Sequence, residues 1–335
     1  MWLLNNGSVI LYIDAQRDQI NEWLHAPDFK YDLDATSQLR HPGTCEWLLK
    51  LEQYEAWKTS NAKDIIWMHG APCSGKTVLA SAVINQLRLE RKPVAYFFFR
   101  ADEKVIGPPK NTTISCLNAL VAQLLGLMEA QHTPFPDDFR RIYMEEKHNG
   151  QVKLTNVHTA LKVIRALLNV SPRVHIVVDG LDECLDRQDF AVRRVEFHKV
   201  MKELITYSYT GIVKLFFGSR HERIFEKLFT KPGRIIEVTQ EHTATDIAVF
   251  LNDNDYVWGE EQDGIIYPLV TGGNFLEAAL ELSTQNYAGV TCEEELKEAQ
   301  WQYKPGFTTR YCRSLEMLAA RSPQEKRLAK FVVFS

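Results

Sequence analysis

Five short runs rich in apolar residues are the clearest feature in the pattern of hydrophobic and polar positions along the chain. They begin near residues 65, 94, 174, 213 and 234. A strand that is apolar along its whole length is typical of a sheet covered on both faces, and such sheets are mainly parallel. Between the runs, apolar residues recur every three or four positions, as they do in amphipathic helices. The pattern predicts an α/β fold with three layers and a mainly parallel five-stranded sheet.

Helical spacing of apolar residues predicts helices before, between and after these strands. Before the first strand it appears at residues 20–24 and 47–57, on either side of a turn in which Thr44 is a candidate N-cap. A polar stretch with Pro134 and Pro136 is assigned no element. The other predicted helices cover residues 78–89, 113–128, 154–170, 192–208, 245–251, 264–270, 273–282, 293–303 and 311–320.

The first strand ends in a glycine-bounded loop that fits the P-loop pattern G-x-x-x-x-G-K-[ST] at every fixed position. The loop consists of Gly70, Ala71, Pro72, Cys73, Ser74, Gly75, Lys76 and Thr77. Its glycines let backbone N–H groups surround a phosphate, Lys76 can reach the β and γ oxygens, and Thr77 can offer its hydroxyl to Mg²⁺. Such a turn can arise by chance, but the strand before it and the helix after it favour a nucleotide-phosphate site.

A second signal for phosphate chemistry is the strand at residues 174–178, which ends in Asp179. A carboxylate at the carboxyl edge of a parallel sheet can reach the Mg²⁺ that accompanies a triphosphate. Asp182 and Glu183 follow three and four residues later, where either carboxylate could orient the attacking water. The alternative interpretation is a buried strand followed by an acidic turn, and the P-loop upstream makes it the weaker one.

An arginine follows the fourth apolar run, at the same predicted edge of the sheet. The run at residues 213–217 continues into Gly218, Ser219 and Arg220. A guanidinium at this edge can contact the γ-phosphate and stabilise the charge that develops during phosphoryl transfer. An exposed arginine after a strand is also common in proteins without this function.

Composition excludes several classes of protein. The 335 residues are 45% hydrophobic and 24% charged, and the net charge of −4 argues against a general nucleic-acid binder. The opening residues lack the pattern of a signal peptide, and no run reaches the roughly 18 apolar residues of a membrane span. Six cysteines without a CxxC pair are typical of reduced thiols. We therefore expect a cytoplasmic protein that binds neither nucleic acid nor membranes.

Several of these segments occur together in one known family. They are Arg40, Gly43-Thr44-Cys45-Glu46-Trp47-Leu48, Tyr54, Trp57, the P-loop, the YFFF run of the second strand, the DGLDE sequence and Ser219-Arg220. In this combination the chain resembles the NACHT domains of fungal signalling NTPases of the STAND class, including the nephrocystin-type N-terminal domain. The resemblance covers residues 20–330, about to the point where a winged-helix domain would begin.

The resemblance implies an arrangement of domains. A helical N-terminal segment at residues 1–62 would lead into a P-loop NTPase core at 63–240, and a small helical lid would follow at 241–335. The sheet would carry an extra strand between the phosphate strand and the acid strand. The nucleotide base would lie against the segment that contains Thr44. Two positions depart from the family pattern, because Cys73 replaces a glycine and Gly218 replaces a threonine.

The resemblance also implies a function. The chain would be a signalling switch that binds ATP or GTP with Mg²⁺, hydrolyses it slowly, rests with ADP or GDP, and associates with itself in the triphosphate state. Three alternatives stay open: a catalytically inert module in which nucleotide is a structural ligand, a small-molecule kinase, and a truncated family member. No zinc-protease helix and no serine or cysteine nucleophile pattern supports another hydrolase class.

Cys73 carries a separate hypothesis. A non-glycine residue in a left-handed conformation at this position would cost about 1–2 kcal/mol. A thiol among N–H donors at a helix N-terminus should have a lowered pKa and react readily. We therefore expect iodoacetamide to label Cys73 before the other cysteines, and bound nucleotide to protect it.

Overall fold

The computed structural model describes residues 17–59, 65–100, 107–185, 190–229 and 233–253, together with Phe275. The helices predicted at residues 264–270, 293–303 and 311–320 lie outside the described residues, as does the helix predicted at 273–282 apart from Phe275. The helix predicted at residues 245–251 is part of α11 (Gln240–Asn252).

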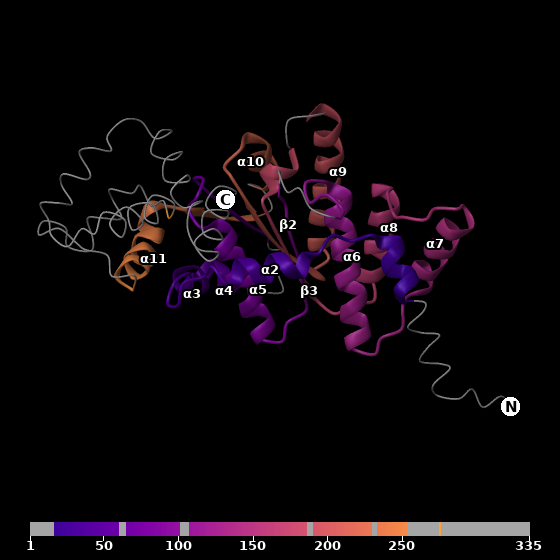
Figure 1. Ribbon diagram of the computed structural model, residues 1–335, viewed down its shortest axis with the longest axis horizontal. Helices are drawn as coiled ribbons and strands as arrows, with labels where there is room; N and C mark the ends of the chain where they lie inside the picture. Colours follow the sequence, from indigo (N-terminus) through magenta and orange to yellow (C-terminus); the bar gives the residue numbers. More distant parts are fainter. Residues whose placement is uncertain are drawn as a thin grey trace, which may run out of the picture.

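All five predicted strands form one sheet at the centre of the protein (Figure 1). They are β1 (Ile65–Gly70), β2 (Val94–Phe98), β3 (Val174–Asp179), β4 (Val213–Ser219) and β5 (Gly233–Val238). The order across the sheet is β2-β3-β4-β1-β5, and each neighbouring pair is parallel. Strand β4 therefore lies between the phosphate strand β1 and the acid strand β3, as the family resemblance implied.

Helices cover both faces of the sheet and complete three layers. Successive strand residues point to opposite faces, so Trp67 and Met68 belong to different hydrophobic clusters. The cluster with Met68 includes residues of α2 (Phe29–Ser37), α3 (Glu46–Lys50), α4 (Glu52–Thr59) and α5 (Lys76–Leu89). The cluster with Trp67 includes residues of α6 (Thr113–Ala130), α7 (Asp137–His148), α8 (Val157–Leu168), α9 (Phe190–Ser208) and α10 (Arg223–Phe229). The predicted fold class is confirmed.

The segment before β1 is helical, but its details differ from the prediction. A helix over residues 17–24 buries Trp23 and Leu24. The continuous helix predicted over residues 47–57 is interrupted at Leu51, whose backbone is extended (φ −63°, ψ 134°) between α3 and α4. Thr44 is not the N-cap of α3. Cys45 holds that position in a left-handed conformation, and the Thr44 hydroxyl donates to the carbonyl of His41 at 2.7 Å.

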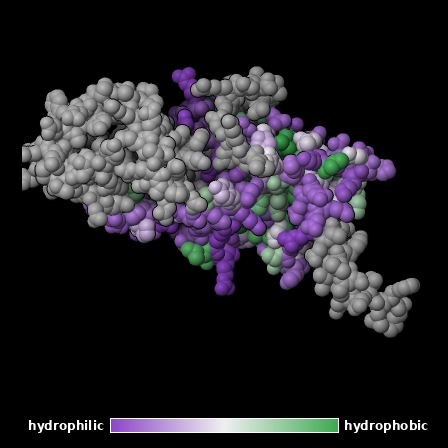
Figure 2. All heavy atoms as spheres, in the orientation of Figure 1, coloured by the Kyte–Doolittle hydropathy of each residue, from purple (hydrophilic) through white to green (hydrophobic). Residues whose placement is uncertain are grey.

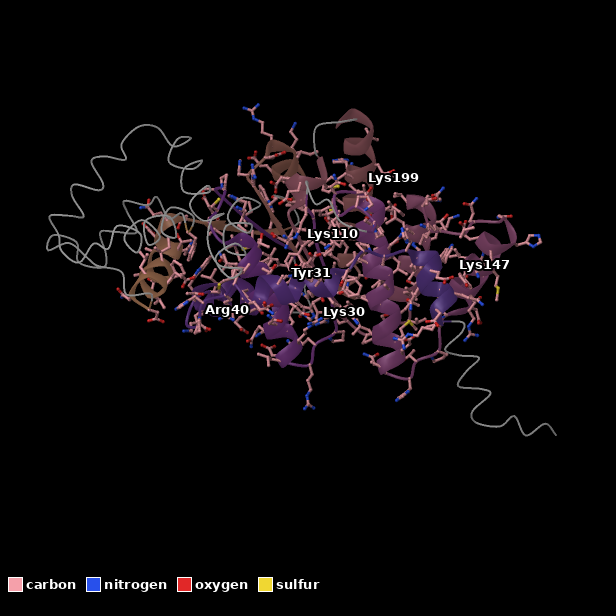
Figure 3. The ribbon with its side chains drawn as sticks, in the orientation of Figure 1. Lys30, Tyr31, Arg40, Lys110, Lys147 and Lys199 are labelled. Carbon is pink, nitrogen blue, oxygen red and sulfur yellow. The ribbon has the colours of Figure 1, made fainter. Side chains whose placement is uncertain are left out.

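A buried ion pair connects α2 with the loop before α6. Asp32 is fully buried and accepts a hydrogen bond from Lys110 Nζ at 2.8 Å. The Lys110 ammonium also lies 5.8 Å from the centre of the Tyr31 ring, and Figure 3 shows the two side chains next to one another. Arg100 adds a second cation, with Nε 3.5 Å from the same Asp32 oxygen. Because a buried charge left without its partner is costly, this contact fixes α2 against the core.

One helix was missed by the sequence analysis. The polar stretch after Pro136 forms α7 (Asp137–His148), which buries Phe139, Ile142 and Tyr143. These three apolar residues lie on one face at helical spacing, but charged residues outnumber them in the segment. Pro136 at the N-cap position marks the start of the helix, because proline is tolerated before the first turn.

Helix α6 has the length and mean hydropathy of a membrane-spanning helix, although it is not a continuous apolar run. Of its 18 residues, 67% are buried inside the protein, against α8 and β2. Helix α6 is therefore a core helix of this protein.

Over the described residues, the face drawn in Figure 2 is mainly hydrophilic, with scattered apolar side chains between the charged ones.

Candidate functional site

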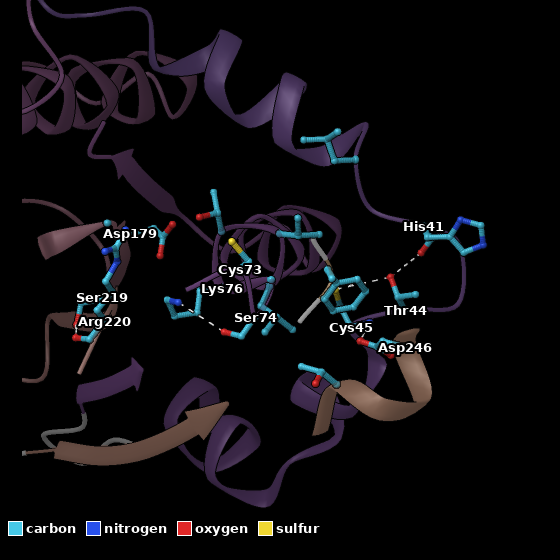
Figure 4. A pocket seen from close by; sticks show the side chains of 18 of the residues that line it. His41, Thr44, Cys45, Cys73, Ser74, Lys76, Asp179, Ser219, Arg220 and Asp246 are labelled. Atoms are coloured by element: carbon cyan, nitrogen blue, oxygen red, sulfur yellow. Dashed lines mark hydrogen bonds between the residues drawn. The ribbon is translucent and has the colours of Figure 1, made fainter. Parts of the chain in front are cut away.

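The predicted phosphate, acid and arginine residues meet at the carboxyl edge of the sheet, around a cavity of about 140 Å³ (Figure 4). This follows from the parallel topology, because the carboxyl ends of β1, β3 and β4 all face the same way. The predicted residues that line it are Thr44, Cys73, Ser74, Gly75, Lys76, Thr77, Asp179, Asp182, Glu183 and Arg220. Gly70, Ala71 and Pro72 belong to the same loop but do not line the cavity.

The loop between β1 and α5 turns through two left-handed residues. Gly75 has φ +82° and is the N-cap of α5, where glycine adopts this conformation at little cost. Cys73 has φ +60°, which is unfavourable for a residue with a side chain. No side chain caps α5, so the N–H groups of its first turn are available to an anion in the cavity.

Lys76 is folded back onto the loop that it follows. Its Nζ donates to the carbonyl of Ala71 at 2.6 Å and to that of Gly70 at 3.2 Å. Burial lowers the pKa of Lys76, while the neighbouring carboxylates of Asp179 and Asp182 act in the opposite direction. A phosphate in the cavity would offer the ammonium a charged partner in place of these two neutral carbonyls.

Asp179 and Thr77 bring two side-chain oxygen atoms together in the cavity. Asp179 ends β3 with only 4% of its surface exposed, and it accepts a hydrogen bond from the Thr77 hydroxyl. Burial raises the pKa of Asp179, while this hydrogen bond and the charge of Lys76 oppose the rise. A hard cation such as Mg²⁺ prefers oxygen ligands of this kind, so the pair fits the predicted metal.

Arg220 and Asp182 are bound to one another at the edge of the cavity where the adjacent strands β3 and β4 end. The backbone N–H of Arg220 donates to Asp182 Oδ1 at 2.9 Å, and Arg220 Nε lies 3.1 Å from Oδ2. Asp182 and Glu183 are carried by a short 3₁₀ helix, η1 (Leu181–Leu185). Ser219 fixes the end of β4, because its hydroxyl accepts from the Trp67 indole at 2.9 Å and donates to the Arg220 carbonyl at 2.8 Å.

The cavity continues away from the phosphate loop toward the segment that contains Thr44, and α11 closes this end. Thr243, Asp246 and Phe250 of α11 line it. The sequence analysis placed Asp246 and Phe250 in a predicted helix but assigned none of the three to the site. Asp246 is 5% exposed, and its Oδ2 accepts from the backbone N–H of Cys45 at 2.8 Å. The three residues share one helical face, since they are three and four positions apart. An acidic residue on the same face as an aromatic one is the feature of the sequence that could have indicated a site here.

Two further side-chain contacts hold α11 against this segment. The rings of Trp47 and His242 are stacked, with centroids 4.4 Å apart and an interplanar angle of 5°. His41 Nε2 lies 2.8 Å from Asp253 Oδ2. The N-terminal segment and the start of the predicted lid are therefore in direct contact across the cavity.

Phe275 also reaches the phosphate loop, and the sequence analysis did not single it out. Its backbone N–H donates to the carbonyl of Cys73 at 3.2 Å, and its ring lies against Gly75. It lines the cavity with the residues above. The sequence feature that could have indicated Phe275 is its position near the start of the helix predicted at residues 273–282.

Comparison with known proteins places this geometry in a family. The family model described as Nephrocystin 3, N-terminal, matches residues 43–220, which include the P-loop, Asp179 and Arg220. The match also includes residues 43–48, the segment with Thr44, which we call the base-side segment because the resemblance implies that the base would lie there. The chain belongs to this family. The resemblance to the NACHT-type domain is thereby confirmed, and the sheet and loop are those of a P-loop NTPase fold.

A curated relative and two solved structures show more distant similarity. The chain is 26% identical over 141 residues to the vegetative incompatibility protein HET-E-1 of Podospora anserina, a match that covers 42% of this chain and 10% of the relative. DnaA bound to AMPPCP and single-stranded DNA matches 84% of this chain and 73% of its own, with 13% identity and a TM-score of 0.41. AMPPCP-bound DnaA from Aquifex aeolicus matches 88% and 80%, with 14% identity and a TM-score of 0.42.

Proposed function

We propose that this chain is a nucleotide-dependent switch that binds ATP or GTP together with Mg²⁺. The observation that carries the proposal is the convergence of Lys76, Thr77 and Asp179 on one cavity at the carboxyl edge of the sheet. The three residues come from two strand ends that another strand separates, and only the parallel fold brings them together. Membership of the nephrocystin-3 N-terminal family supports the same interpretation.

The phosphate chain would lie over the N-terminus of α5. Backbone N–H groups between Cys73 and Thr77 would donate to its oxygens, and Lys76 would leave the carbonyls of Gly70 and Ala71 for the β and γ oxygens. Thr77 and Asp179 would hold Mg²⁺, which neutralises phosphate charge when it is bound. Because Asp179 is only 4% exposed, bulk water would have little access to its carboxylate.

Slow hydrolysis is the second part of the proposal. Asp182 or Glu183 would orient the attacking water, since both carboxylates line the cavity beside Asp179. Arg220, at the end of β4, would contact the terminal phosphate and stabilise the charge that develops on transfer. ADP or GDP would remain after hydrolysis.

Switching would follow from contacts at both ends of the cavity. A nucleotide can shift a conformational equilibrium only if it binds one arrangement better than the other. Here α11 contacts the base-side segment through Asp246 and Cys45, and Phe275 contacts the phosphate loop. A bound nucleotide would therefore change contacts that tie the predicted lid to the core. Self-association in the triphosphate state is part of this proposal, and light scattering with triphosphate and with diphosphate tests it.

A catalytically inert binding module is the second candidate, and two observations favour it. Arg220 is already paired with Asp182, and Cys73 holds the loop in a conformation that is unfavourable for it. In such a module the nucleotide would act as a structural ligand that stabilises the fold by mass action. Ligand at about 100 times its dissociation constant adds roughly 2.7 kcal/mol.

Phosphate release under steady-state conditions separates the two candidates. We expect release by the wild-type chain that depends on Mg²⁺ and falls to background in Lys76→Ala. Glu183→Gln and Asp182→Asn identify which carboxylate the reaction needs. Release no greater than that of Lys76→Ala, from a wild-type chain that still binds nucleotide, would favour the inert module.

A further inference from the structure

The carboxylate of Asp182 is occupied at both oxygens by one residue. Oδ1 accepts the backbone N–H of Arg220 at 2.9 Å, and Oδ2 lies 3.1 Å from its Nε. Asp182 therefore serves Arg220 through both of its carboxylate oxygens.

The two contacts to Asp182 differ in how easily they can be exchanged. The bond to the backbone N–H involves the fixed end of β4, where Ser219 is held by Trp67. The guanidinium of Arg220 is different, because 53% of its side chain is exposed while only 11% of the Asp182 side chain is. A guanidinium on a flexible, half-exposed side chain can turn to another anion, and phosphate is a strong one for arginine.

We propose that Asp182 is a positioning residue that holds Arg220 in competition with the terminal phosphate, and so sets how strongly the site distinguishes a nucleoside triphosphate from a diphosphate. This inference rests on the proposed function. When a triphosphate binds, Nε of Arg220 leaves Oδ2, and the bond between Oδ1 and the backbone N–H stays in place. A diphosphate lacks the third phosphate that competes with Asp182 for the guanidinium, so Arg220 remains paired with Asp182.

Asp182→Asn separates this role from a purely structural one. The asparagine side-chain oxygen can still accept the backbone N–H of Arg220, so the end of β4 keeps its acceptor. The variant removes only the charge that holds the guanidinium. Arg220→Gln removes the guanidinium itself, and the double variant Asp182→Asn with Arg220→Gln tests whether the first effect acts through the second residue.

The experiment is calorimetric titration of all four chains with a non-hydrolysable Mg²⁺-triphosphate and with the diphosphate of the same base. We expect Asp182→Asn to bind the triphosphate about two- to fivefold more tightly, since partly exposed ion pairs are worth up to about that factor. Arg220→Gln should bind the triphosphate more weakly, and the double variant should match Arg220→Gln. The diphosphate constant should change less than about twofold throughout, because the exchange does not involve that ligand.

Two results would overturn the inference, and they differ in what else they affect. In the first, Asp182→Asn binds nucleotides but prefers triphosphate over diphosphate no more than the wild type does. Asp182 would then not restrain Arg220, while the proposed function stands. A wild-type chain that binds neither nucleotide better than Lys76→Ala would remove the proposed function and this inference together. Thermal unfolding of each variant checks that it is folded. If Asp182→Asn is not folded, Arg220→Gln still tests the inference, because an unchanged preference for triphosphate in that variant would overturn it.

Discussion

The carboxylate of Asp179 occupies the space that a β-carbon on residue 218 would fill. Asp179 ends β3 and Gly218 lies in the neighbouring strand β4, where an added Cβ would overlap Asp179 Oδ1. The side chain of Asp179 can thus hold its hydrogen bond with Thr77 only because residue 218 has no side chain. The departure from the family's threonine at this position has a local structural reason.

Gly218→Ala should weaken binding of the Mg²⁺-nucleotide. The added methyl group would force Asp179 to turn away from Thr77, and the two oxygens would no longer face one cation. We expect at least roughly a tenfold rise in the dissociation constant in Mg²⁺, measured by titration, and a smaller change in EDTA. Gly126→Ala is the matched control, because a Cβ there meets nothing within 4 Å and alanine favours the helix. Equal effects of the two substitutions would refute this role of Gly218.

Cys73 should be the first of the described cysteines to react with iodoacetamide. It lines the cavity and is partly exposed, whereas Cys45, Cys116 and Cys184 are buried, and none of the four is in a disulfide. Burial raises the pKa of Cys45 to about 11 and also raises that of Cys116, so both stay protonated. Peptide mass spectrometry should find Cys73 modified first, and Mg²⁺-nucleotide should slow its labelling. Labelling of all cysteines at one rate, or no protection, would contradict the proposed position of the phosphate.

Asp246→Ala should destabilise the contact between α11 and the base-side segment. It would leave the buried backbone N–H of Cys45 without its acceptor, at a cost of about 1–3 kcal/mol. Asp246→Asn keeps an acceptor and should cost less, because burial already raises the pKa of Asp246 and disfavours its charge. Chemical denaturation measures both, with Thr245→Ala on the exposed face of the same helix as control. A loss in Asp246→Ala no larger than in the control would show that this contact contributes nothing.

His175 should make the protein less stable in mild acid. Burial lowers its pKa from 6.5 to about 4, so below pH 6.5 the unfolded chain takes up a proton that the folded chain refuses. Stability should fall as the pH drops from about 6.5 to 4, by up to about 3 kcal/mol from this residue. Denaturation of His175→Gln across this range should show a shallower pH dependence, while His158→Gln, which is exposed, should follow the wild type. Parallel curves for wild type and His175→Gln would contradict the assignment.

The strands and the phosphate loop could be predicted because their signals are local. Each strand is a short run rich in apolar residues, and the P-loop places Gly75, Lys76 and Thr77 at three consecutive positions. Helix α7 was missed because charged residues outnumber Phe139, Ile142 and Tyr143 in the segment. A helix that packs against the core through only a few apolar residues gives a weak periodic pattern, and the sequence analysis relied on that pattern.

Contacts between distant parts of the chain were beyond the sequence pattern. Asp246 and Cys45 are 201 positions apart, and nothing in either segment indicates that a helix after the sheet closes over the N-terminal turn. The same holds for Asp182 and Arg220, which are 38 positions apart and were assigned separate roles. Their pairing depends on the adjacency of β3 and β4, which the order of strands along the chain does not determine.

Native mass spectrometry of the whole chain with Mg²⁺ and ATP, GTP or ADP tests the central claim most directly. We predict that one nucleotide binds per wild-type chain with at least one of these ligands, and that Lys76→Ala, measured under the same conditions, binds none. A wild-type chain that retains no nucleotide, or a Lys76→Ala chain that retains as much as the wild type, would contradict the account.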